Sequence, residues 1–227
     1  MAGPRIRSLD LTRLHIPFTV AFRHASAERS ETSTLWVEAV SQSGATGCGE
    51  SCPRDYVTGE TLDTAEAFFA RHAAALCDEI VDLPSLRGWM ARHTEELDAN
   101  PAAWCAIDLA LLDMLAKDDR QTVERFLSLP ELRGRFFYTA VLGDATPQVF
   151  QATADQYQRL GFTDFKLKLS GDLDRDLAKL AIVGRWDGVR MRVDANNLWR
   201  GTDEAIAFLR ALDYRFNNVT RADSHAF

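Results

Sequence analysis

The spacing of hydrophobic and polar positions in residues 1–130 predicts an α+β domain. Alternation typical of half-buried strands covers residues 6–17 and 35–41, and the glycine-rich stretch 44–49 then predicts turns and a third short strand. Between the first two strands, residues 22–34 are polar and rich in Ser, Thr and Arg, which predicts a loop. Helical periodicity follows, and the predicted helices cover residues 61–77, 85–97 and 102–117.

From Gly134 onward, predicted strands and helices alternate strictly. The predicted strands cover residues 136–142, 163–169 and 189–194, and the predicted helices cover residues 147–160, 173–183 and 203–212. Three consecutive βα units predict a parallel sheet, either doubly wound or part of a barrel. The first βα turn lacks the Gly-x-Gly-x-x-Gly sequence that cradles a dinucleotide phosphate, which favours the barrel. We therefore predict a second domain at residues 131–227, formed by the first three βα units of a (β/α) barrel.

Composition and charge exclude several classes of protein. Of the 227 residues, 46% are hydrophobic and 26% are charged, which is typical of a globular protein rather than a fibrous or disordered one. The net charge of −7, without a basic stripe, argues against a nucleic-acid partner. The first residues lack the apolar core of a signal peptide, and no apolar run approaches the ~20 residues of a membrane span. We expect a cytoplasmic protein that has no membrane partner.

The four cysteines predict free thiols. Cys48, Cys52, Cys77 and Cys105 are irregularly spaced, and Cys105 lies in an apolar helical pattern, where a small buried thiol is common. Cys48 and Cys52 could in principle bind zinc, but no second Cys or His pair stands at ligand spacing. The sequence therefore favours reduced cysteines over a zinc site.

Two lysines and a carboxylate stand at the ends of consecutive predicted strands. Alternation in residues 163–169 places Lys166 and Lys168 on one face, and the next strand places Asp194 and Asn196 on one face. If the strands are adjacent and parallel, both ammonium groups converge on an ion that Asp194 binds. Taken alone, such a lysine strand is common as an exposed edge strand, and Asp-Ala-Asn is common as a turn or helix cap. The βα order favours a site, because such folds place their sites at strand C-termini.

Three further motifs carry a family resemblance. Residues 103–117, the run Gly47-Cys-Gly49-Glu50 and residues 53–61 stand in order before the Lys-x-Lys and Val-Asp-Ala-Asn strand ends. Over residues 11–216, the chain resembles the mandelate racemase and muconate lactonizing branch of the enolase superfamily, most closely its dipeptide epimerases. The resemblance implies an α+β capping domain, which selects the substrate, followed by an incomplete (β/α) barrel of the TIM type.

The chemistry that the resemblance implies is abstraction of the proton α to a carboxylate, giving an enediolate held by a divalent ion. Lys168 corresponds to the general base and Asp194 to the first ligand of Mg²⁺, a hard cation suited to carboxylate oxygen. Lys166, as a nearby cation, would help Lys168 to act as a base and would help to neutralise the substrate carboxylate. The α proton is too weakly acidic for a lysine alone, so the developing charge needs the metal. Asn196 would lie beside the metal ligand or at the substrate.

Substrate selection in this family rests with loops of the capping domain. Arg23, in the first loop, could pair with a distal carboxylate such as a glutamate side chain or a succinyl group, and a solvated arginine is an equally good interpretation. Tyr56 in the second loop and Thr139 on the first barrel strand are further candidates for substrate contact, whereas His24 fits a surface residue better. The expected partner is a small carboxylate. A dipeptide, a succinylbenzoate precursor and muconate all stay open, as does a homo-oligomer.

The resemblance is lost after Phe216. The family has a second carboxylate ligand in a Glu-Glu-Pro or Glu-Asp-Pro setting, a third acidic ligand and a second lysine, and residues 217–227 provide none of them. The residues after the capping domain are also too few to close a barrel of roughly 250 residues. We therefore expect a C-terminally truncated or frameshifted homologue that is inactive as this chain. The alternative is a non-catalytic fragment or module that keeps the fold for binding only.

Overall fold

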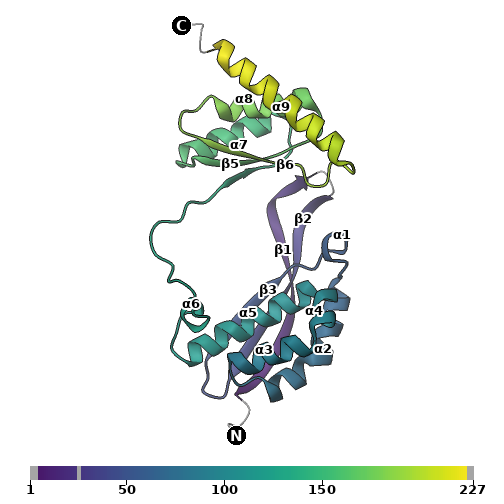
Figure 1. Ribbon diagram of the computed structural model, residues 1–227, viewed down its shortest axis with the longest axis vertical. Helices are drawn as coiled ribbons and strands as arrows, with labels where there is room; N and C mark the ends of the chain where they lie inside the picture. Colours follow the sequence, from purple (N-terminus) through teal and green to yellow (C-terminus); the bar gives the residue numbers. More distant parts are fainter. Residues whose placement is uncertain (1–4, 25–26, 224–227) are drawn as a thin grey trace. The chain divides into compact units, whose positions relative to one another are not determined.

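The computed structural model describes residues 5–24 and 27–223, apart from the side chains of residues 20–29, 214 and 216–223. The chain forms two compact units (Figure 1). The first unit comprises Met1–Phe18 and Glu31–Arg133, and the second comprises Thr19–Ser30 and Gly134–Phe227. The sequence predicts one contiguous division after residue 130, whereas the structure groups Thr19–Ser30 with the second unit.

A three-stranded sheet opens the chain, with strand order β1-β2-β3. β2 and β3 are antiparallel, with a register that runs from Leu35 opposite Ser51 to Val40 opposite Thr46. The first two strands are long, and the bounds are β1 Ile6–His24, β2 Ala27–Ser41 and β3 Thr46–Ser51.

The predicted loop at residues 22–34 is wrong over most of its length. Extended strand continues to His24 in β1 and resumes at Ala27 in β2. Thr32 and Thr34 help to explain the difference, because β-branched side chains favour extended backbone even in a polar segment. Thr34 is also buried, and its hydroxyl donates a hydrogen bond to the Ser51 carbonyl of β3. A polar composition was therefore compatible with paired strands.

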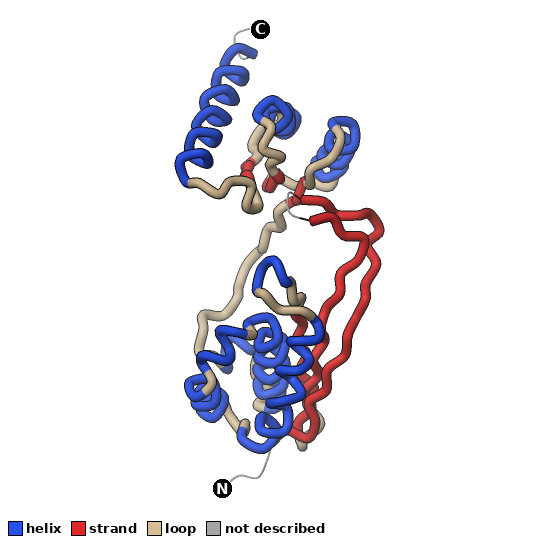
Figure 2. Tube along the Cα trace, turned by 90° about the vertical axis from the view of Figure 1, so that its right-hand side faces the viewer, coloured by secondary structure: helices blue, strands red, loops and turns tan. Residues whose placement is uncertain are grey.

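The helices of the first unit lie on one side of its strands (Figure 2). The sequence predicts a single helix at residues 85–97, but the structure divides it at His93, which ends α3 and precedes α4. The bounds are α1 Asp55–Thr58, α2 Leu62–Glu79, α3 Leu83–Arg92, α4 Thr94–Ala99, α5 Pro101–Asp118 and α6 Val123–Phe126.

The amino end of α5 is capped from a distant part of the chain. The side chain of Asn100, which precedes the helix, makes no capping hydrogen bond. Instead the buried carboxylate of Glu60 accepts hydrogen bonds from the backbone N–H groups of Ala102, at 2.7 Å, and Ala103, at 2.9 Å. An anion at a helix N-terminus pairs N–H groups that have no partner within the helix. Glu60 therefore joins the segment before α2 to the central helix.

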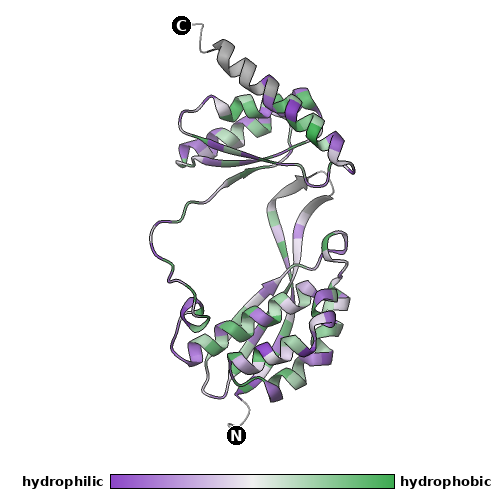
Figure 3. Cartoon of the chain, in the orientation of Figure 1, coloured by the Kyte–Doolittle hydropathy of each residue, from purple (hydrophilic) through white to green (hydrophobic). Residues whose placement is uncertain are grey.

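The core of the first unit is built around α5, most of which is hydrophobic (Figure 3). β3 lies directly against this helix through Gly47 and Gly49. A Cβ atom at Gly49 would overlap the Ala106 carbonyl oxygen, and one at Gly47 would overlap the backbone of Ala110. Alanines on the helix and glycines on the strand thus allow the two backbones to approach closely.

We predict that Gly49→Ala destabilises the first unit by about 3 kcal/mol, the upper end of the usual cost of overpacking, because the obstructing atoms belong mainly to the α5 backbone and cannot rotate away. Gly88→Ala is the matched control. The nearest atom to a Cβ at Gly88 is the end of Arg92, 3.7 Å away, and alanine in a helix interior is favoured over glycine by about 0.5–1 kcal/mol. Urea denaturation, combined with hydrogen exchange of α5 peptides, measures the stability of both variants. Equal stability of the two variants would contradict the close approach.

The second unit contains three parallel strands and three long helices within its described residues (Figure 1). The strand order is β4-β5-β6, and Phe165 of β5 lies between Ala140 of β4 and Met191 of β6. Its core includes Phe150 and Leu167, both almost fully buried. The bounds are β4 Ala140–Leu142, α7 Pro147–Arg159, β5 Asp164–Lys168, α8 Leu173–Gly184, β6 Arg190–Asp194 and α9 Thr202–Asp223.

Two predicted boundaries in this unit are wrong. Residues 136–139 are not part of β4, since the described pairing with β5 begins only at Ala140, and Tyr138 is 82% exposed. Aromatic residues favour strands only where a neighbouring strand pairs with them. The last helix, predicted to end at residue 212, continues to Asp223 because residues 213–223 contain neither glycine nor proline.

The cysteines and the hydropathy of the helices give two further results. All four cysteines are free, as predicted, but Cys105 is exposed rather than buried. It lies on α5, which is so rich in apolar residues that its pattern alone does not identify the covered face. Among the described residues, none of the helices has the length and hydropathy needed to span a bilayer.

Candidate active site at the strand ends

Lys166, Lys168 and Asp194 converge, as the alternation of their strands predicts. β5 and β6 are adjacent and parallel, and Lys168 lies opposite Asp194 in the register. The Nζ atoms of Lys168 and Lys166 lie 2.8 Å and 3.3 Å from the same Asp194 oxygen, Oδ2. The Lys168 side chain is only 9% exposed, whereas that of Lys166 is 35% exposed. Two cations and one carboxylate therefore form a partly enclosed cluster at the C-terminal ends of the strands.

Asn196 completes this cluster in a tight turn after β6. Its backbone is in the left-handed region, with φ of 41°, and its N–H donates to Asp194 Oδ1 at 3.2 Å. The Asn196 side-chain oxygen accepts a second hydrogen bond from Lys168. The pKa of Asp194 lies below its ordinary value, mainly because Lys168 donates a hydrogen bond to the carboxylate. Burial alone would raise this pKa, whereas the hydrogen bonds from Lys166 and the Asn196 N–H lower it further. Asp194 is therefore ionised at neutral pH.

The other candidate residues lie elsewhere or outside the description. Thr139 directly precedes Ala140, which lies opposite Phe165 in the register, so Thr139 is nearer the amino ends of the strands than Lys168 is. Its hydroxyl accepts a hydrogen bond from Arg192. Tyr56 lies on the one-turn helix α1 and is 46% exposed. The side chain of Arg23 lies outside the described residues. The structure thus brings Asn196 to the lysine pair and leaves the contacts of Arg23 unassigned.

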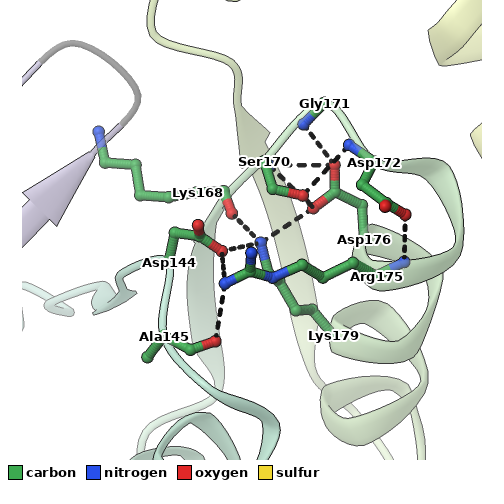
Figure 4. A network of polar contacts seen from close by, with 9 residues as sticks. All are labelled: Asp144, Ala145, Lys168, Ser170, Gly171, Asp172, Arg175, Asp176 and Lys179. Carbon is green, nitrogen blue, oxygen red and sulfur yellow. Dashed lines mark hydrogen bonds and ion pairs between the residues drawn. The ribbon is translucent and has the colours of Figure 1, made fainter.

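A buried ionic network next to the cluster was not predicted (Figure 4). The ammonium group of Lys179, on α8, lies 2.7 Å from Asp144 Oδ1 and 2.9 Å from Asp176 Oδ1. It also donates to the Lys168 carbonyl oxygen at 3.0 Å, while the Lys168 side chain points away from the network. Lys179 is 4% exposed and Asp176 is fully buried. The network therefore holds the backbone of the residue that carries the candidate base.

Asp176 extends this network to the loop that follows β5. Its carboxylate accepts hydrogen bonds from the backbone N–H groups of Ser170 and Gly171 and from the Ser170 hydroxyl, at 2.8–3.1 Å. A carboxylate with this many donors is well satisfied despite its burial. The sequence signal was the Asp176 and Lys179 pair at i and i+3 on a helix, which is equally common on solvated faces.

Comparison with known proteins supports the interpretation of the fold. The family described as "Enolase C-terminal domain-like" matches residues 149–219. The chain is 31% identical to the L-Lys-D/L-Arg epimerase of Methylococcus capsulatus over 85% of its length, and 27% identical to the L-Ala-D/L-Glu epimerase of Bacillus subtilis over 92% of its length. A crystal structure of the dipeptide epimerase from Methylococcus capsulatus, complexed with Mg and the dipeptide L-Arg-D-Lys, is similar with a TM-score of 0.79.

The matches cover most of this chain but only part of each relative. The matched segments cover 54% of the Methylococcus capsulatus epimerase sequence and 57% of the Bacillus subtilis epimerase sequence. The match to the crystallised Methylococcus capsulatus protein has 27% identity and covers 92% of this chain and 59% of that protein. The chain thus spans about half the length of the curated relatives it matches. The expected fold class, an α+β capping domain followed by an incomplete (β/α) barrel, is confirmed. The chain belongs to the enolase superfamily, as a homologue of dipeptide epimerases and other enzymes of the mandelate racemase and muconate lactonizing branch.

Proposed function

We propose that this chain supplies the base, a neighbouring cation and one metal ligand of a site that abstracts the proton α to a carboxylate. The observation that carries the proposal is the approach of Lys168 and Lys166 to one oxygen of Asp194 at adjacent parallel strand ends. Lys168, the less exposed of the two, is the general base, and its contact with Asn196 orients it. Lys166 neutralises the substrate carboxylate.

The donor atoms of the cluster fit Mg²⁺ in kind. Asp194 is an ionised carboxylate, and hard oxygen ligands of this type suit Mg²⁺. When bound there, the ion would supply electrostatic stabilisation of the negative charge that develops on the substrate carboxylate. Asn196 would remain beside Asp194, since its N–H already fixes the Oδ1 oxygen. Lys166 and the metal would thus share the task of stabilising charge, while Lys168 accepts the proton.

The cluster offers only one carboxylate ligand among the described residues. Within the described residues, Asp194 belongs to no group of three potential metal ligands. Mg²⁺ demands near-octahedral oxygen coordination, so one carboxylate leaves it largely hydrated and weakly held. We infer that the residues of this chain need further acidic ligands before turnover, and that the chain by itself is inactive. The same lack of ligands favours, as the second candidate, a module that binds a small carboxylate without catalysis.

A dipeptide is the substrate that we favour, since several relatives bear the names of dipeptide epimerases. In this proposal residues 1–130 select the substrate, with Arg23 and Tyr56 contacting it, and residues 131–227 carry the chemistry. Asn196 is the better-placed candidate for a substrate contact near the base, whereas Thr139 would act through Arg192. Cycloisomerisation of muconate or formation of o-succinylbenzoate is the alternative reaction on the same base. We place the protein in the cytoplasm, acting alone or as a homo-oligomer.

We predict that the purified chain exchanges the α-proton of L-Ala-L-Glu no faster than its Lys168→Ala variant does. Both samples are incubated with Mg²⁺ in deuterated water, and the loss of the α-proton signal is followed by NMR. Equal, background rates are expected because Asp194 alone holds the metal weakly. Exchange in the unaltered chain that is faster than in Lys168→Ala would show that the described ligands suffice for turnover.

A further inference from the structure

Three potential metal ligands meet in the first unit, separate from the strand-end cluster. His72 lies on α2, His93 lies between α3 and α4, and Glu96 lies on α4. One ligand atom from each residue lies within 4.8 Å of the other two. Among the residues that the structure describes, no other group of three His, Cys, Asp or Glu side chains comes as close. This group has no role in the function proposed above.

The Nε2 atom of His72 is a buried polar atom without a hydrogen bond. His72 is 7% exposed, and within the described part of the chain its Nε2 has no hydrogen-bond partner. Glu96 Oε2 lies 3.2 Å away, but the pair does not have hydrogen-bond geometry. Buried polar atoms are normally satisfied, so a buried nitrogen that has no hydrogen bond although a carboxylate oxygen lies beside it points to an absent partner that both atoms could bind.

His93 belongs to the same group, and one of its ring nitrogens already has a partner. Its Nδ1 lies 2.9 Å from the Trp89 carbonyl oxygen, which can only accept, so Nδ1 carries the proton. The neutral ring then has its lone pair on Nε2. The His93 ring stacks on Trp89 with centroids 4.0 Å apart, which fixes its orientation. A histidine that donates its other N–H to a backbone carbonyl is the usual arrangement in metal sites.

Glu96 is held so that one oxygen remains available. Its Oε1 pairs with Arg71 at 3.3 Å, while Oε2 faces His72. The backbone of Glu96 is fixed as well, because the Asn100 side chain donates to its carbonyl oxygen at 2.9 Å. The carboxylate can therefore contribute one oxygen to a cation without leaving Arg71.

We propose that His72, His93 and Glu96 form a Zn²⁺ site with one open coordination position. Two imidazole nitrogens and a carboxylate oxygen suit Zn²⁺, whereas Mg²⁺ prefers oxygen ligands alone. Tetrahedral coordination at 2.0–2.1 Å places ligand atoms about 3.3 Å apart. The side chains thus close by at most about 1.5 Å from the 4.8 Å that bounds the present separations. A surface hollow of about 350 Å³, which His93 and Glu96 line, gives the open position access to water or to a small anionic ligand.

Isothermal titration of the full chain with ZnCl₂ tests this site. The titration is carried out in excess Mg²⁺, which occupies sites made of oxygen ligands. The protein is first alkylated with iodoacetamide, so that the exposed thiols of Cys52 and Cys105 cannot bind Zn²⁺. We expect one Zn²⁺ per chain and a rise in melting temperature on binding. His93→Gln and Glu96→Gln should each weaken the affinity on the order of tenfold or more, since each removes one of three ligands.

Matched controls separate loss of a ligand from loss of fold. Glu95→Gln changes the neighbouring carboxylate, and His15→Gln changes an exposed histidine on β1, so both should bind Zn²⁺ as the unaltered chain does. Circular dichroism of each metal-free variant shows whether it is folded. Failure of the folded, unaltered chain to bind Zn²⁺, or unchanged affinity in both His93→Gln and Glu96→Gln, would overturn the proposal. Because these variants leave Lys168 and Asp194 in place, the outcome is independent of the proposed function.

Discussion

Lys179→Met is expected to destabilise the second unit by about 3–5 kcal/mol. The substitution keeps much of the side-chain volume but removes the cation that faces Asp144 and Asp176. Asp176 is fully buried, so its charge would lose its ionic partner where water cannot replace it. The Lys168 carbonyl oxygen would also lose its donor. We therefore expect faster hydrogen exchange in peptides of β5 and α8 than in the unaltered chain.

Arg185→Met is the control for this prediction. Arg185 pairs with Asp155, but its side chain is 46% exposed, and pairs of this kind contribute about 0–1 kcal/mol. Both variants remove one cation from the helical side of the same unit. If Lys179→Met left the exchange of β5 as slow as Arg185→Met does, the network would not stabilise the strand end.

The lysine and aspartate cluster could be predicted because its signals are local. Alternation with period two fixes which side chains share a face, and the strict βα order fixes that the strands are parallel. Together they place Lys168 opposite Asp194, as the register has it. The turn at Asn196 was harder to predict, since its left-handed backbone and its contact with Lys168 depend on both strands.

Structural contacts between distant segments could not be predicted from local pattern. Glu60 lies in residues 53–61, which the family resemblance assigns to a loop of the capping domain, yet it is buried and caps α5. Gly47 and Gly49 look like turn residues, but they are required by the close approach of α5. The buried Lys179 is indistinguishable in sequence from a solvated lysine. The partners of Glu60, Gly47 and Gly49 are far along the chain, and so is Asp144, one of the two carboxylates that face Lys179, so no short window of sequence contains all of them.

The predicted limits of strands were wrong where pairing with a neighbouring strand, rather than local composition, decides the structure. The polar segment at residues 22–34 is mostly extended, because its threonines tolerate a strand and Thr34 finds a partner on β3. The aromatic residues 136–138 are not in a strand, because described pairing begins only at Ala140. Propensity is a weak guide at such edges, where a neighbouring strand decides.

The role of Lys168 as the base is tested most directly in a chain that contains further barrel strands. A fusion would join residues 1–216 to the part of the Methylococcus capsulatus L-Lys-D/L-Arg epimerase that lies beyond the matched segment. L-Ala-L-Glu and L-Lys-L-Arg are the substrates, and Lys117→Ala, which alters an exposed lysine paired with Asp113 on α5, is the control.

The decisive measurement is the rate of α-proton exchange of this fusion in deuterated water with Mg²⁺, followed by NMR. We predict exchange in the fusion and in its Lys117→Ala variant, and a rate on the order of 10²–10⁴-fold lower in Lys168→Ala, the usual contribution of a general base. Equal rates in the fusion and its Lys168→Ala variant would contradict the assignment of Lys168 as the base.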